Sequence, residues 1–134
     1  MERLKLRYAS ADRALNTLIE ILKEPFSIVV RDAAIQRFEY TFEAVWKLVR
    51  EYLHEVEGIV CVSAKSCIRS AVSVGLMNEE EGVAALEMVD DRNLTSHTYH
   101  EEVAQKIFSK LYDYSRLMSL LLERIKQNTP QHSR

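Results

Sequence analysis

The feature that most constrains the fold is a sustained apolar seam between residues 35 and 56. Apolar residues recur there at alternating spacings of three and four, which is the period of one face of an α-helix. The seam consists of Ile35, Phe38, Phe42, Val45, Val49, Tyr52 and Val56, and it is widened by Trp46 and Leu53. We therefore expect one long core helix, closed by Gly58, that must bury this face against other helices.

Other apolar stripes of the same period predict helices over residues 4–22, 64–74, 79–92 and 103–125. Pro25 follows the first of these, and Gly75 ends the second. Asn78 with Glu81 three residues later forms the pattern of a capping box before the third. The stripe of the last predicted helix is unusually broad, which suggests that this helix packs against two neighbours.

Composition supports long regular elements, because the chain has only three glycines and two prolines and is 47% hydrophobic. Short connections favour antiparallel neighbours, so we expect an all-α, up-and-down four-helix bundle with the short helix before Arg92 as an extra element. Apolar surface left over on a small bundle predicts a homodimer. We expect one domain over residues 1–127 and a disordered C-terminal tail over residues 128–134.

The formal net charge of -2 argues against a nonspecific nucleic-acid binder, which would carry a basic excess. Cys61 and Cys67 do not form a CxxC motif and lie in an apolar helical context, so we expect buried thiols in a reducing cytosol. The first twenty residues contain no uninterrupted apolar segment. We therefore expect a soluble, cytoplasmic protein with neither a signal peptide nor a membrane span.

The stretch whose side chains are best suited to catalysis or binding runs from Arg92 to Tyr99 and reads Arg-Asn-Leu-Thr-Ser-His-Thr-Tyr. A guanidinium neutralises phosphate through a planar fork of donors, and an imidazole such as that of His97 moves protons near neutral pH. Together they suit phosphodiester chemistry. The alternative is structural, because a basic residue near the last carbonyls of a helix and a histidine in the next turn are ordinary features.

The other candidate site residues also have a purely structural explanation. Glu39 and Glu43 share a helix face and suit acid–base chemistry, although a solvated or interface surface explains them as well. Phe38, Phe42 and Trp46 fit core packing better than a base-stacking platform, because they lie on or beside the seam.

A metal pair of His97 and His100 lacks a third ligand at recognisable spacing, so we expect no metal. The chain has no glycine-rich nucleotide-binding loop. We therefore expect no cofactor, and we do not expect this chain to transfer nucleotides itself.

Two stretches resemble a known family. The pattern Arg92, four residues, His97, any residue, Tyr99 is similar to the motif of the HEPN superfamily, and the polar Asn93 also fits that motif. Residues 36–47, Gln-Arg-Phe-Glu-Tyr-Thr-Phe-Glu-Ala-Val-Trp-Lys, resemble the second-helix signature of the HepT-like branch, long labelled nucleotidyltransferase substrate-binding proteins.

The resemblance implies a homodimeric helical bundle encoded beside a minimal, MntA-like nucleotidyltransferase, as one half of a toxin–antitoxin pair. It implies a metal-independent endoribonuclease, with RNA as substrate and with Arg92 and His97 as the catalytic pair in a cleft at the dimer interface. It also implies that the partner silences the enzyme by adenylylating Tyr99. The older label of the family implies the alternative, a non-catalytic subunit that presents substrate to the nucleotidyltransferase. Glu39, Glu43, Lys47 and Asn93 are the supporting candidates in the groove.

Overall fold

The computed structural model describes residues 1–130, and helices are the only regular secondary structure in that range. They are α1 (Glu2–Leu22), α2 (Ile28–Glu57), α3 (Ala64–Ser73), α4 (Glu79–Asn93), a short 3₁₀ turn η1 (Leu94–His97) and α5 (Glu101–Asn128). Each predicted helix is present, which confirms the all-α class. Helix α2 begins at Ile28 rather than at Ile35, because Ser27 caps it by accepting a hydrogen bond from the backbone N–H of Val30.

Local sequence signals account for most helix ends. Gly58 ends α2 with a left-handed φ of 69°, a conformation that costs glycine less than any other residue. Asn78 and Glu81 form the predicted capping box, in which each side chain accepts a hydrogen bond from the other's backbone N–H. Ser63 and Ser66 form a second capping box at the start of α3, which the sequence reading missed.

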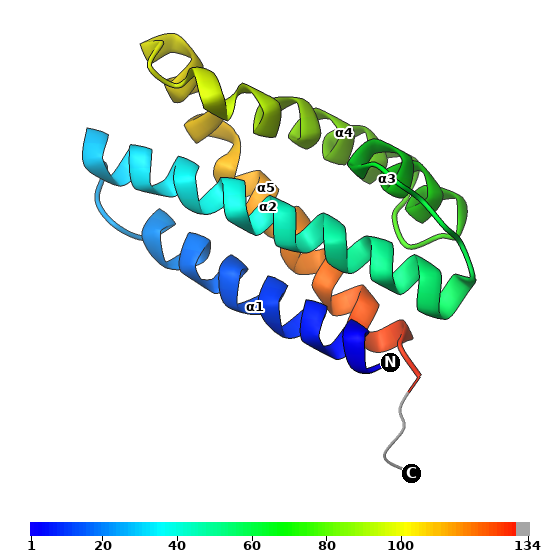
Figure 1. Ribbon diagram of the computed structural model, residues 1–134. Coiled ribbons are helices and arrows are strands. Elements are labelled where there is room, and N and C mark those ends of the chain that lie inside the picture. The colour runs from blue at the N-terminus through cyan, green and yellow to red at the C-terminus, as the bar shows by residue number, and fades with distance from the viewer. Residues whose placement is uncertain (131–134) are drawn as a thin grey trace.

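The three long helices build the body of the bundle (Figure 1). Helices α1 and α2 lie side by side and run in opposite directions, and α5 packs against both. Helix α3 packs on α2 and on α4, and α4 also contacts α5. An all-helical bundle is therefore confirmed. Helix α5 packs against three helices, α1, α2 and α4, one more than the two expected. The four-helix up-and-down topology and the homodimer stay predictions.

The predicted stripes supply the core. Six of the seven seam residues are buried, and Val56 packs partly buried against them. Phe38 is fully buried, and its ring stacks on that of Tyr114 from α5 at a centroid distance of 5.7 Å. Phe42 is also buried and Trp46 is half-buried, so their interpretation as core residues is confirmed.

The expectation of two free thiols is wrong, because Cys61 and Cys67 form a disulfide. Cys61 is not helical: α2 ends at Glu57 and α3 begins only at Ala64. That break lets the chain fold back until the two Cα atoms are 5.2 Å apart. On one continuous helix, residues six apart would be separated by about 9 Å along the axis, too far for a disulfide.

The C-terminal prediction is partly wrong. Helix α5 continues through Asn128, which was expected to begin a disordered tail, and residues 131–134 lie outside the described part of the chain. Within residues 1–130, no helix is both long enough and apolar enough to span a bilayer.

Candidate functional site

The motif forms the corner between α4 and α5. Arg92 lies in the last turn of α4, His97 ends η1, and Tyr99 lies in the short connection before α5. Hydroxyl side chains help to shape this corner, because each donates a hydrogen bond to a carbonyl three residues earlier. The donors are Thr95, Ser96 and Thr98, and the acceptors are the carbonyls of Arg92, Asn93 and Thr95.

The Arg92 guanidinium faces two carboxylates of α2. Its Nη1 lies 3.6 Å from Glu39 Oε2, and its Nε lies 3.4 Å from Glu43 Oε2. Thr95 Oγ1 accepts a hydrogen bond from Arg92 Nη1 at 3.2 Å and lies 2.7 Å from Glu39 Oε2, which competes with the Arg92 carbonyl for its single proton. The arginine side chain is 27% exposed, so this cluster of Arg92, Glu39, Glu43 and Thr95 is half-buried rather than a solvated surface.

One donor of this cluster has no good acceptor. Arg92 Nε is buried and makes no hydrogen bond with any residue in the described range, although it lies 3.4 Å from Glu43 Oε2. Glu43 is engaged from the other side, where its Oε1 accepts a hydrogen bond from the indole N–H of Trp46 at 3.1 Å. A buried donor without a hydrogen-bond partner costs about 1–3 kcal/mol, and the ion pair with Glu43 offsets part of that cost.

His97 and Tyr99 lie together on the outer side of the corner. His97 is exposed and Tyr99 is 75% exposed. The Nδ1 of His97 lies 3.4 Å from the Tyr99 hydroxyl oxygen, and the Tyr99 ring packs against that of His100 at a centroid distance of 4.3 Å. Arg92 and His97, the two predicted catalytic groups, make no hydrogen bond with each other in one copy of the chain.

A buried polar network fixes the end of α4 just before the motif. Asp91 Oδ2 accepts hydrogen bonds from the hydroxyl of Tyr114 at 2.5 Å and from Lys110 Nζ at 3.2 Å. Burial and the bond to Asp91 raise the pKa of Tyr114, so its hydroxyl stays protonated and donates. Burial lowers the pKa of Lys110, but its bonds to Asp91 and Glu87 outweigh this and raise the pKa overall.

An ion pair fixes the start of α5 just after the motif. Arg31 of α2 is only 3% exposed and donates hydrogen bonds to both carboxylate oxygens of Glu101, which is the first residue of α5. The hydrogen bonds from Arg31 lower the pKa of Glu101, and the same contact raises the pKa of Arg31. The corner is therefore anchored on α2 at both ends, through Arg92 and through Glu101.

The structure brings together only some of the predicted site residues. Arg92, Glu39 and Glu43 meet, and His97 meets Tyr99. Asn93 is exposed, and the half-buried Lys47 makes no hydrogen bond or ion pair with any described residue, so neither joins the Arg92 cluster.

Sequence reasoning missed Thr95 and Asp91. Thr95 lies three residues after Arg92 and therefore one helical turn away, a spacing that could have suggested the contact. Asp91 lies beside Arg92 in the sequence, but nothing in the pattern distinguishes it from the exposed Asp90.

Comparison with known proteins identifies a family and a shared fold. The family described as "Nucleotidyltransferase substrate binding protein like" matches residues 6–127. A protein of Haemophilus influenzae named "Probable ribonuclease HepT" is 32% identical over 98 residues, which are 70% of this chain and 66% of that protein, just under two thirds of its length.

Solved structures share the fold. A protein of Thermus thermophilus is 55% identical, with a TM-score of 0.84 over 87% of this chain and 98% of that one. A HEPN toxin of Shewanella oneidensis, solved tri-AMPylated in complex with an MNT antitoxin, is 13% identical, with a TM-score of 0.75 over 92% of this chain and 96% of that one. At that identity the likeness concerns the fold alone. The chain belongs to the nucleotidyltransferase substrate-binding-protein-like family.

Proposed function

We propose that this chain is the HepT-like subunit of a two-component pair with a minimal nucleotidyltransferase, and that it is a metal-independent endoribonuclease. The observation that carries the proposal is the corner itself, where the motif arginine is held on α2 with an unused buried donor and the motif histidine is exposed. The H. influenzae relative named ribonuclease HepT and the HEPN toxin bound to an MNT antitoxin support the same assignment.

The chemistry requires a base, an acid and a group that stabilises negative charge. The 2′-hydroxyl of a ribose attacks the adjacent phosphorus as His97 removes its proton, and the bond to the 5′-oxygen of the next nucleotide breaks. The products are a 2′,3′-cyclic phosphate and a 5′-hydroxyl that takes up a proton. General acid–base catalysis of this kind supplies about 10²–10⁴-fold in rate, and Arg92 would stabilise the charge on the phosphoryl oxygens.

A homodimer would complete this centre. Arg92 and His97 make no hydrogen bond with each other within one copy of the chain, and one imidazole cannot serve as base and acid at the same moment. Two copies of the corner across a two-fold axis would supply two histidines and two arginines to one cleft.

Tyr99 is the proposed site of silencing. Its exposed phenol can reach a partner's active site, and transfer of an adenylyl group from ATP to its oxygen would release pyrophosphate and replace the phenol proton. That oxygen lies 3.4 Å from His97 Nδ1, so the added phosphate would lie beside the catalytic imidazole. Inhibition would be both steric and electrostatic.

The test is cleavage of total RNA in excess chelator by protein whose intact mass shows no adenylyl group. We expect wild type to cleave, His97→Ala to lose at least about 10²-fold in rate, and His100→Ala to cleave like wild type. His100 is the matched control because it is the neighbouring exposed histidine outside the motif. Light scattering must show a dimer for each protein.

Two observations favour a second function. Glu39 and Glu43 already pair with the Arg92 guanidinium, and the formal net charge of -2 gives the chain no general attraction for RNA. These features suit a non-catalytic subunit that presents substrate to the nucleotidyltransferase, as the family description suggests. No cleavage by verified, unmodified dimer would favour this second function.

A further inference from the structure

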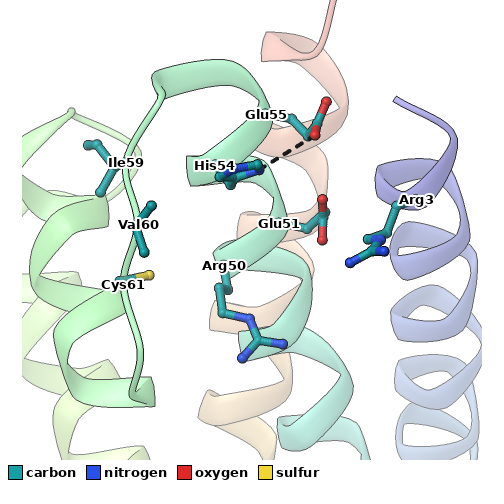
Figure 2. A pocket seen from close by; sticks show the side chains of 8 residues that line it. All are labelled: Arg3, Arg50, Glu51, His54, Glu55, Ile59, Val60 and Cys61. Atoms are coloured by element: carbon teal, nitrogen blue, oxygen red, sulfur yellow. Dashed lines mark ion pairs between the residues drawn. The ribbon is translucent and has the colours of Figure 1, made fainter.

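A second group of side chains lies at the other end of α2, away from the motif. Glu51, His54 and Glu55 project from the last two turns of α2 into a surface hollow of about 530 Å³. Figure 2 shows that the segment with Ile59, Val60 and Cys61 forms one wall, and that Arg3 reaches in from α1. This hollow is separate from the Arg92 cluster, because residue 51 lies eight residues beyond Glu43 on the same helix, about 12 Å along its axis.

The three side chains provide a converging set of metal donors. One nitrogen of His54 and one oxygen from each of Glu51 and Glu55 all lie within 4.8 Å of one another. Donor atoms bound to one tetrahedral Zn²⁺ at about 2.1 Å are separated from each other by roughly 3.4 Å. His54 Nδ1 and Glu55 Oε2 are already 3.5 Å apart, so only a small movement of the exposed side chains is required.

Local charge also favours a cation here. Two carboxylates one helical turn apart repel each other, and Glu51 makes no ion pair with any residue from 1 to 130. The group lies near the C-terminus of α2, where the helix dipole presents its negative end.

Among residues 1–130, the positive charges near the site leave the carboxylate of Glu51 without an ion pair. The guanidinium of Arg50 lies over the Trp46 ring, 5.0 Å from its centroid. Neither Arg50 nor Arg3 lies within ion-pair distance of Glu51 or Glu55, and the Met1 amino group is 3.4 Å from Glu55 Oε1. These positive charges weaken the binding of a cation, but none of them forms an ion pair with Glu51.

We propose that Glu51, His54 and Glu55 bind a divalent transition metal of the zinc class. One imidazole with two carboxylates is a borderline nitrogen and oxygen donor set, which suits Zn²⁺ better than Mg²⁺ or Ca²⁺. Cys61 lines the same hollow, but its sulfur is bonded to Cys67 and does not belong to the ligand set. This site does not depend on the ribonuclease proposal.

The test is a calorimetric titration of untagged, oxidised protein with zinc chloride, without reductant. We expect one ion per chain with a micromolar dissociation constant. His54→Ala should bind at least ten-fold more weakly, and Glu51→Gln and Glu55→Gln should each weaken binding. Glu57→Gln is the matched control, because it removes the same charge from the last turn of the same helix outside the donor set, and it should bind like wild type.

Three results would overturn the proposal. They are a wild-type dissociation constant for zinc in the millimolar range, unchanged zinc affinity in His54→Ala, and a loss of zinc affinity in Glu57→Gln as large as that in Glu51→Gln. The last would mean that zinc responds only to the general charge of the surface. Circular dichroism of each variant shows whether it is folded, and Glu51→Gln gives an independent reading if His54→Ala is not.

Discussion

The hydroxyl of Tyr114 offers a clean perturbation, because Tyr114→Phe removes one oxygen and keeps the ring. The ring continues to stack on Phe38, so core packing is preserved. What disappears is the hydrogen bond that the hydroxyl donates to Asp91, whose side chain is only 4% exposed. The buried carboxylate is left with Lys110 as its remaining side-chain partner.

The size of the effect follows from the charge of the acceptor. Hydrogen bonds to charged groups contribute about 1.5–3 kcal/mol, and this one is buried, so we expect Tyr114→Phe to lower the free energy of unfolding by roughly 2 kcal/mol. For a domain of this size that corresponds to a fall in Tm of about 5–10 °C. Because Asp91 precedes Arg92, the same change should loosen the end of α4 that carries the motif arginine.

Urea unfolding followed by circular dichroism, at one fixed protein concentration, measures the change. Tyr112→Phe is the control, because Tyr112 is 61% exposed and its hydroxyl makes no hydrogen bond with a described residue. We expect the control to match wild type and the m-value to stay constant in both variants. A change below about 0.5 kcal/mol in Tyr114→Phe, which is typical of a surface substitution, would refute the argument that this bond holds α4 to α5.

Two further predictions concern α4. A Cβ added at Gly82 would lie 2.5 Å from Val72 Cγ2 of α3, so Gly82→Ala should lower the free energy of unfolding by about 1–3 kcal/mol. Val72→Ala removes the clashing methyl groups, so it should cost much less stability in the Gly82→Ala background than in wild type. Additive losses of stability in urea unfolding would contradict the clash. Hydrogen bonds from Arg124 lower the pKa of Glu81 in the folded state. The stability that they provide is therefore fully present above the pKa of Glu81 in the unfolded chain, about 4.3, and is lost as pH falls through the folded pKa. Between about pH 5 and pH 3 the free energy of unfolding should therefore fall less steeply in Glu81→Gln than in wild type, and equal slopes would show that the ion pair adds nothing.

The helices could be predicted from the sequence because their signals are local. The apolar period of three and four depends only on the geometry of one helix, and the ends set by Gly58 and by Asn78 with Glu81 depend on residues within one turn. The motif from Arg92 to Tyr99 was readable for the same reason. Its residues are close in the sequence, and their types indicate their chemistry.

Contacts between helices could not be predicted from those patterns. Thr95 and Glu39 are 56 residues apart in the sequence, and they meet only because η1 packs against α2. The packing of α4 on α2 likewise decides that Glu39 and Glu43 pair with Arg92. The disulfide was misjudged because the sequence reading placed Cys61 in a helical context, whereas the turn after Gly58 takes it off the helix and brings it near Cys67.

Local sequence patterns are therefore enough to predict which segments are helical, which face of each is buried and which residues have the chemistry for a site. The tertiary structure alone decided which of those residues meet, because side chains distant in the sequence come together only through the packing of whole helices. Arg92 is consequently a partnered, half-buried charge, while His97 and Tyr99 are exposed on the outer side of the corner. No pattern within a single helix contains that distinction.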